Sequence, residues 1–186
     1  MASWDAELES PIHGAVNVHG EGNRIVTEPN SQIQCAMTII GNRNRISIGG
    51  QCVIRGGILI QSVDDVEIEI GDRSTLSGVS IQAHETARVS IGLDFMFSTE
   101  IMMSVSDMHP IFHADGKRIN PAADIVIGDH VWIGFRCVVL KGARIGAGAV
   151  IGAGSIVHGD IPAGAVAAGN PARVIRRDVT WRRNLR

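Results

Sequence analysis

The fold of this chain is decided by the stretch from Ile127 to Val157, which reads IGDHVWIGFRCVVLKGARIGAGAVIGAGSIV. Every sixth residue of the stretch is Ile or Val, in the order Ile127, Ile133, Val139, Ile145, Ile151 and Val157. A glycine follows most of these aliphatic residues, and a residue of small or modest size stands four positions after each of the first five. A helical face repeats at about 3.6 residues and a strand at two, so neither element explains the period.

A period of six predicts a short strand followed by a corner, repeated many times. The aliphatic side chain would point inward and stack on its counterpart in the next coil, the glycine would relieve crowding at the bend, and the small residue would fit the inner corner. Each coil could bury its core only against its neighbours, as coils do in solenoids. We therefore expect an all-β chain. The composition agrees, because glycine is frequent at 22 residues and aromatic residues are scarce at 4%.

The pattern continues toward the N-terminus with shifts of phase. The phrase Ile-x-Ile-Gly ends at Gly49, Gly71 and Gly128, and Gly92 ends a similar phrase. The shifts predict bulges or small insertions between the coils. The longest break, about residues 105–124, predicts a protruding polar loop, and a loop on a regular scaffold is where function usually lies. We expect one domain over residues 1–186, with residues 162–186 as a short C-terminal tail.

Composition excludes several classes of protein. A net charge of −2 provides no basic field for nucleic acid or an anionic membrane. Three widely spaced cysteines suggest neither a disulfide framework nor a zinc knuckle. The N-terminus lacks the apolar run of a signal peptide, and no stretch approaches the ~20 apolar residues of a membrane span. We therefore expect a cytoplasmic protein. One interpretation of the basic tail is that it is a solvated terminus. Its basic residues are Arg173, Arg176, Arg177, Arg182, Arg183 and Arg186.

Two segments resemble a known family. Ile151–Val157, followed by Asp160-Ile-Pro and Gly169-Asn-Pro-Ala-Arg, resembles the C-terminal signature of hexapeptide-repeat acetyltransferases. Ser106-Asp-Met-His-Pro, followed by Ile127-Gly-Asp-His-Val-Trp, resembles their catalytic half. The likeness spans about residues 40–176 and is nearest to sugar and polysaccharide O-acetyltransferases. It implies a left-handed parallel β-helix, assembled as a homotrimer with active sites between subunits.

The resemblance also implies catalytic roles. His109 would be the general base that removes the proton from the acceptor hydroxyl. Histidine suits this task, because an alcohol is a weak nucleophile and imidazole titrates near neutral pH. Asp107 would either orient the imidazole of His109 or cap the turn before Pro110. Cys137 is expected at an inward corner, where it is a poor candidate for a nucleophile.

The acyl donor implied by the resemblance is acetyl-CoA, with no metal. Trp132 is expected to face outward and to line the cleft between subunits. The family match assigns four further residues to the cofactor, and the arginines among them suit its phosphates: Ala153, His158, Arg173 and Arg176. One departure is the pair His158-Gly159, where the family often has Thr-Lys. The missing lysine removes one possible phosphate contact.

Two other functions remain open. A metal-dependent γ-type carbonic anhydrase uses the same fold and would need three histidines as ligands, for which His84, His109 and His113 are candidates. A non-catalytic scaffold would need no base. Bound metal would favour the first, and thiol release from acetyl-CoA would exclude the second. The acceptor stays unidentified among monosaccharides, nucleotide sugars, capsule or lipopolysaccharide units, and antibiotics.

Overall fold

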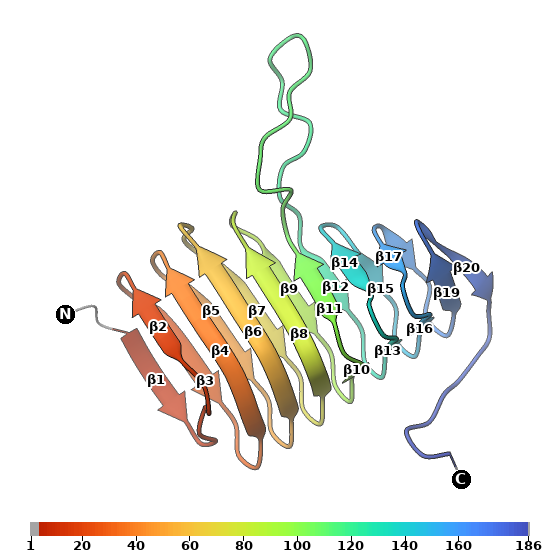
Figure 1. Ribbon diagram of the computed structural model, residues 1–186, viewed down its shortest axis with the longest axis horizontal. Helices are drawn as coiled ribbons and strands as arrows, with labels where there is room; N and C mark the ends of the chain where they lie inside the picture. Colours follow the sequence, from red (N-terminus) through yellow and green to blue (C-terminus); the bar gives the residue numbers. More distant parts are fainter. Residues whose placement is uncertain (1–3, 186) are drawn as a thin grey trace.

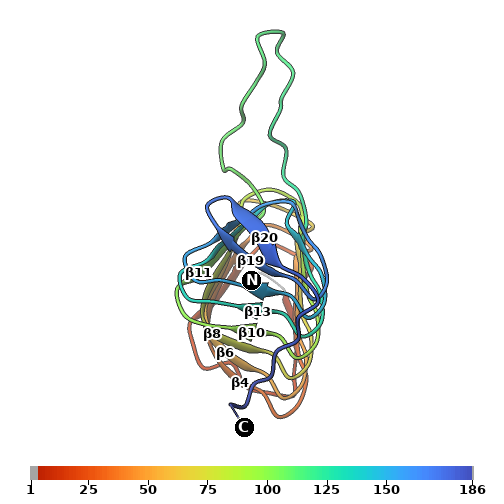
Figure 2. The same cartoon turned by 90° about the vertical axis from the view of Figure 1, so that its right-hand side faces the viewer.

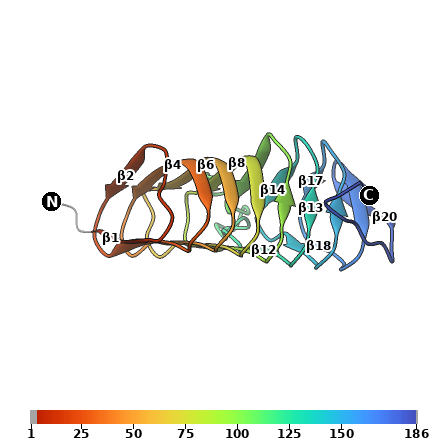
Figure 3. The same cartoon turned by 90° about the horizontal axis from the view of Figure 1, so that it is seen from below.

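The chain forms a left-handed parallel β-helix, as the family resemblance implied. The computed structural model describes residues 4–185, and every regular element within them is a β-strand. Figure 1 shows the coils stacked in one row from the N-terminus to the C-terminus, and Figure 3 shows the same row from below. The part of the chain that is described contains no helix of the length and apolarity that crossing a membrane requires.

One wall of the helix is a sheet of eight parallel strands. Each coil contributes one strand to it, and each strand pairs with its counterpart in the next coil. Its members in spatial order are β1 (Trp4–Leu8), β3 (Asn23–Thr27), β5 (Arg45–Ile48), β7 (Glu67–Ile70), β9 (Arg88–Ile91), β12 (Ile125–Ile127), β15 (Arg144–Ile145) and β18 (Asp160–Ile161).

The second sheet has twelve strands, and long strands in its N-terminal part give way to pairs of short strands toward the C-terminus. Its N-terminal part consists of β2 (Val16–His19) and three long strands, β4 (Gln32–Ile40), β6 (Val53–Gln61) and β8 (Thr75–Ala83). On its far side β8 pairs with two short strands at once, β10 (Met96–Phe97) and β11 (Ile101–Ser104). The following coils keep this division, with β13 (Trp132–Ile133), β14 (Val138–Leu140), β16 (Val150–Ile151), β17 (Ile156–Val157) and β19 (Val166–Gly169). Viewed along the axis in Figure 2, the coils superpose as a flattened ring.

The six-residue repeat, or hexad, therefore describes only the C-terminal coils. Val126 pairs with Arg144, three hexads later, whereas Ile46 pairs with Ile68, and the N-terminal coils are longer by several residues. The expectation of one short strand per hexad is correct near the C-terminus and wrong for β4, β6 and β8. These strands bend within their length instead of breaking. In β6 the bend falls at Gly56, whose φ of 141° is a backbone conformation that glycine adopts readily and other residues rarely do.

The core is the column of aliphatic side chains that the sequence predicted. All six residues of the ladder from Ile127 to Val157 are buried, and so are the small corner residues Cys137 and Ser155. Phe95 also points inward despite its size, because its ring packs edge-on against Phe97 with centroids 4.0 Å apart. Burial of each Ile or Val side chain contributes about 1.5–3 kcal/mol, so the stacked ladder stabilises the coils collectively.

The glycines that follow the aliphatic residues allow the coils to stack closely. A Cβ on Gly146 would lie 2.4 Å from the nitrogen of Ala163, and one on Gly134 would lie 2.8 Å from the nitrogen of Ala153. Neither glycine has a positive φ. The sequence pattern predicted that these glycines relieve crowding at a bend. The cause is more specific, since the crowding comes from the backbone of the next coil.

The regular structure extends further than the sequence predicted. The parallel ladder was expected to end before residue 162, but β19 pairs in parallel with β16. β20 (Ala172–Arg176) then turns back and pairs antiparallel with β19, covering the last coil's edge. Residues 162–176 are thus part of the β-structure, and only the residues after β20 form a tail.

Candidate functional site

A narrow projection leaves the helix between β11 and β12. It comprises residues 105–124, as the sequence predicted, and Figure 1 shows it extending well beyond the coils. An antiparallel bridge between Phe112 and Arg118 closes its outer part into a hairpin. The projection carries His109 and Asp107.

Asn120 organises the base of this projection. Its side chain is buried, and its Nδ2 donates to Asp107 Oδ2 and to the carbonyl of His109, at 2.8 Å in both cases. Its Oδ1 accepts from the backbone N–H of Ile111 at 2.6 Å. One amide side chain thus ties together the Asp107 carboxylate and the backbone of His109 and Ile111. Sequence reasoning did not single out Asn120.

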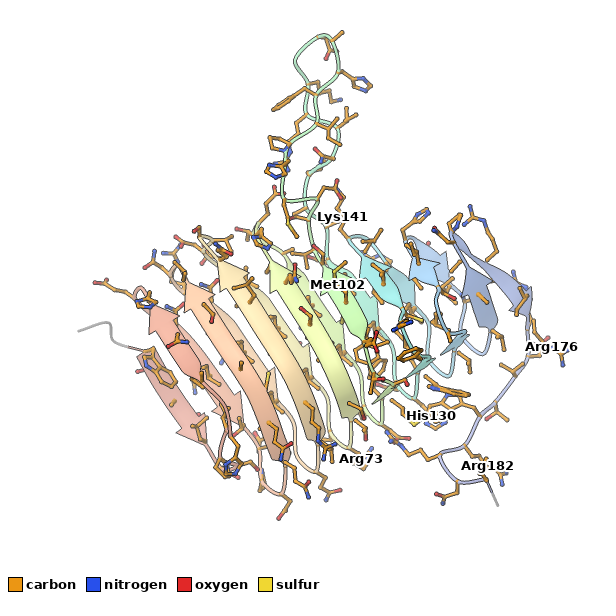
Figure 4. All side chains as sticks on the ribbon, viewed as in Figure 1. Arg73, Met102, His130, Lys141, Arg176 and Arg182 are labelled. Carbon is orange, nitrogen blue, oxygen red and sulfur yellow. The ribbon has the colours of Figure 1, made fainter. Side chains whose placement is uncertain are left out.

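Lys141, on the coil beneath, ties the projection to the helix (Figure 4). Its Nζ donates to Asp107 Oδ2 at 2.5 Å and to the carbonyls of Asn120 and Pro121 at 3.0 and 3.1 Å. The hydrogen bond from Lys141, with that from Asn120, lowers the pKa of the Asp107 carboxyl. The carboxylate is therefore ionised across neutral pH.

His109 itself is held by its backbone and displays its side chain to solvent. Its N–H donates to the carbonyl of Asp107 at 2.7 Å, and Met108, at a φ of 63°, makes the tight turn between them. The imidazole is exposed. The contacts of Asp107 are with Lys141 and Asn120, so its carboxylate braces the loop. The projection thus presents a histidine at a fixed position.

The other predicted site residues lie on different edges of the helix. Trp132 faces outward from β13 with 38% of its surface exposed. Ala153 lies at the corner that stacks on Gly134, and His158 directly follows β17 and is exposed. Arg173 and Arg176 are exposed on β20. Within one chain the structure brings none of these residues up to the tip of the projection, and Figure 1 shows β13 near the edge away from it.

A second cluster, which the sequence analysis missed, adjoins Trp132. The ring of Trp181 stacks on that of His130 with centroids 4.0 Å apart and lies 5.9 Å from the ring of Trp132. His130 Nδ1 is 2.6 Å from Asp94 Oδ2, and Arg183 Nε donates to Asp94 Oδ1 at 2.7 Å. The one available signal was a tryptophan in an otherwise basic tail. The solvated-terminus interpretation is therefore wrong for the segment around Trp181 and Arg183, while Arg186 lies outside the described residues.

The cysteines are unsuited to nucleophilic chemistry. All three are free and buried. Burial raises the pKa of the Cys137 thiol, which lies 3.2 Å from the carbonyl oxygen of Gly152. A buried, protonated thiol is a poor nucleophile. Within residues 4–185 of a single chain, no three His, Cys, Asp or Glu side chains gather as a metal site requires.

Comparison with known proteins relates this geometry to enzymes that modify sugars. Residues 124–159 match the family described as bacterial transferase hexapeptide (six repeats). Over 118 residues the chain is 36% identical to a polysialic acid O-acetyltransferase of Escherichia coli O1:K1 / APEC, covering 63% of this chain and 38% of that protein. The chain spans less than two thirds of the length of the curated relatives it matches.

Two solved structures resemble the whole chain. The polysialic acid O-acetyltransferase OatWY superposes with a TM-score of 0.84 and 25% identity, over 99% of this chain and 93% of that chain. The polySia-specific acetyltransferase NeuO superposes with a TM-score of 0.83 and 31% identity, over 99% of this chain and 87% of that chain. The similarity thus extends from the coils to the projection and the C-terminal segment.

Proposed function

Because this chain belongs to the hexapeptide-repeat acetyltransferase family, we propose that it transfers an acetyl group from acetyl-CoA to a hydroxyl group of a sugar or polysaccharide. The observation that carries the proposal is His109, displayed on a braced projection of a β-helix that resembles two polysialic acid O-acetyltransferases over its whole length. We place the reaction in the cytoplasm, and three free cysteines suit such a reducing compartment.

His109 would act as a general base. As the acceptor oxygen attacks the thioester carbonyl, the imidazole takes the hydroxyl proton. The tetrahedral intermediate then collapses, the carbon–sulfur bond breaks, and the imidazolium returns the proton to the CoA sulfur. Backbone N–H groups would stabilise the oxyanion. Direct transfer needs no acyl-enzyme, which agrees with the burial of every cysteine.

The proposal is tested by measuring free thiol released from acetyl-CoA. Oligomers of sialic acid are the first acceptors to assay, with neutral galactosides and an acceptor-free reaction as comparisons. Acetylated product should appear with at least one sugar acceptor, and mass spectrometry should locate the acetyl group on a hydroxyl. Absence of thiol release with every sugar tested would contradict the proposal.

We further propose that the active site forms between subunits of a homotrimer. The projection displays four apolar side chains that are each about half exposed, namely Met108, Ile111, Phe112 and Ile119. β13, which carries Trp132 of the proposed donor cleft, lies on another edge of the helix (Figure 1). Contact between two copies would cover the apolar projection and could bring a histidine and a tryptophan from different chains into one cleft.

Light scattering at micromolar concentration is therefore expected to give three times the mass of one chain. Replacing Phe112 with serine should weaken the assembly, because that exposed ring would lose its apolar contact in the trimer. Lys117→Ser, on the same hairpin, is the matched control and should leave the mass unchanged. A stable monomer at that concentration would contradict the intersubunit site.

Arg173 and Arg176 are proposed to bind the phosphates of the donor from β20. Arg173→Ala or Arg176→Ala should raise KM for acetyl-CoA by tenfold or more, because each lost charge-assisted bond costs about 1.5–3 kcal/mol. The value of kcat should change less. Arg177→Ala removes a neighbouring exposed charge and serves as the control. If all three variants bind the donor equally well, the phosphates are bound elsewhere.

A further inference from the structure

The segment after β20 lies along one corner of the helix. This corner is a column of residues with left-handed φ, one from each successive coil: Arg73, Asp94, His130, Gly148 and Gly164. Each N–H of the column from Arg73 onward donates to a carbonyl of the preceding coil, as in the bond from His130 to Leu93 at 2.7 Å. We call residues 179–183, which run back over this column, the strap (Figures 1 and 4).

The strap makes specific contacts with several coils. At its start, the N–H of Val179 donates to the carbonyl of Gly164 at 3.0 Å, where the absence of a side chain leaves room. At its end, the guanidinium of Arg183 donates to Asp94 Oδ1 at 2.7 Å, to Thr75 Oγ1 and the Arg73 carbonyl at 3.1 Å, and to the Phe95 carbonyl at 2.8 Å. Four acceptors on one guanidinium fix the path of the strap.

Trp181 occupies the middle of the strap and is 8% exposed. Its Nε1 donates to the carbonyl of His130 at 2.8 Å, while His130 Nε2 lies 3.1 Å from the carbonyl of Trp181. The two rings are parallel to within 6°. Asp94 bridges His130 and Arg183, since its two carboxylate oxygens each accept from one of them. Desolvation opposes ionisation of Asp94, but these hydrogen bonds outweigh it and lower its pKa.

Trp132 stands two residues beyond His130, on the face that Trp181 approaches. The two indole rings are inclined at 46° with centroids 5.9 Å apart, an arrangement in which aromatic rings attract each other. Trp132 projects from a strand of two residues and keeps 38% of its surface exposed. Trp181 is thus a side contact that can limit the rotamers of Trp132.

We infer that the strap is a positioning element of the donor site and that Trp181 is a positioning residue acting through Trp132. The inference rests on the proposed function, in which Trp132 lines the acetyl-CoA cleft. A tryptophan already held in place loses little conformational freedom when a ligand packs against it, whereas a free one must be ordered on binding. Residues 179–183 therefore influence donor affinity through Trp132, without themselves touching the donor.

The test combines kinetics with a spectroscopic signal from the three tryptophans, Trp4, Trp132 and Trp181. Trp181→Ala and Arg183→Ala should each raise KM for acetyl-CoA by about 2- to 10-fold, the cost of immobilising one side chain, with kcat nearly unchanged. Trp181→Phe should retain most of the affinity. Arg182→Ala removes a neighbouring charge, labelled in Figure 4, and is the matched control.

Fluorine NMR of protein labelled with 5-fluorotryptophan reports on Trp132 without any assay. The Trp132 resonance should shift in Trp181→Ala and Arg183→Ala but not in Arg182→Ala, and the Trp4 resonance, from the far end of the helix, should not move. A shifted Trp132 signal with unchanged KM would overturn the link to the donor, and an unshifted one would overturn the contact itself. A wild-type protein without acetyl transfer would refute the proposed function instead, and the Trp132 signal would then decide the positioning role alone.

Discussion

Replacing His109 with alanine is expected to lower kcat by about 10²–10⁴, the usual contribution of a general base, with a smaller effect on KM. The fold should persist, because the side chain is exposed on a projection whose base is held by Asn120 and Lys141. The measurement is steady-state thiol release with circular dichroism of each variant. His113→Ala, an exposed histidine on the same projection, is the control and should retain normal turnover.

The pH profile separates His109 from its neighbour. Lys141 lowers the pKa of Asp107, so the stabilisation from this pair is fully present above the ordinary carboxyl value and is lost only as pH falls below about 4. A fall in kcat at any pH above that value would therefore not come from loss of the loop brace. Near-normal turnover of His109→Ala would refute the base mechanism, as would an inactive but folded Cys137→Ala.

The second large effect is expected on stability, at Gly56. Its φ of 141° disfavours any side chain, and an added Cβ would lie 2.0 Å from the carbonyl oxygen of Val79 in the next coil. Gly56→Ala should lower the free energy of unfolding by about 2–5 kcal/mol, from backbone strain and crowding together. Urea denaturation followed by circular dichroism, at one protein concentration, measures the change.

Gly57 provides a matched control one residue away. Its φ is not positive, and an added Cβ would meet only the carbonyl of Ala36 at 3.6 Å, an ordinary contact. Gly57→Ala should change the free energy of unfolding by less than about 1 kcal/mol. Equal effects of the two substitutions would show that the bend in β6 is not what requires glycine.

The hexad determined the C-terminal half of the fold by itself. Ile127, Ile133 and Val139 are buried where the period placed them, and Trp132 is exposed where the period required it. The residues that break the period also marked the projection, with its base at residues 105 and 124. These features follow from the period itself, because each coil repeats the same alternation of inward and outward side chains and stacks on a neighbour with the same pattern.

Features that depend on residues far apart in the sequence were decided by the tertiary structure. The phase shifts predicted bulges or small insertions between coils, but not that β4, β6 and β8 each run through two repeats of six residues. The bend at Gly56 lies against the backbone of the next coil, which the local sequence does not reveal. The partner of Asp107 is Lys141, which lies 34 residues later on the coil beneath the projection, so the sequence around His109 did not reveal it. The clearest case is the strap. A repeat specifies how each coil stacks on the next, but it carries no information on where a non-repeating end will run, and Trp181 meets His130 only because the chain reverses at β20 and returns along a corner that Gly148 and Gly164 leave open.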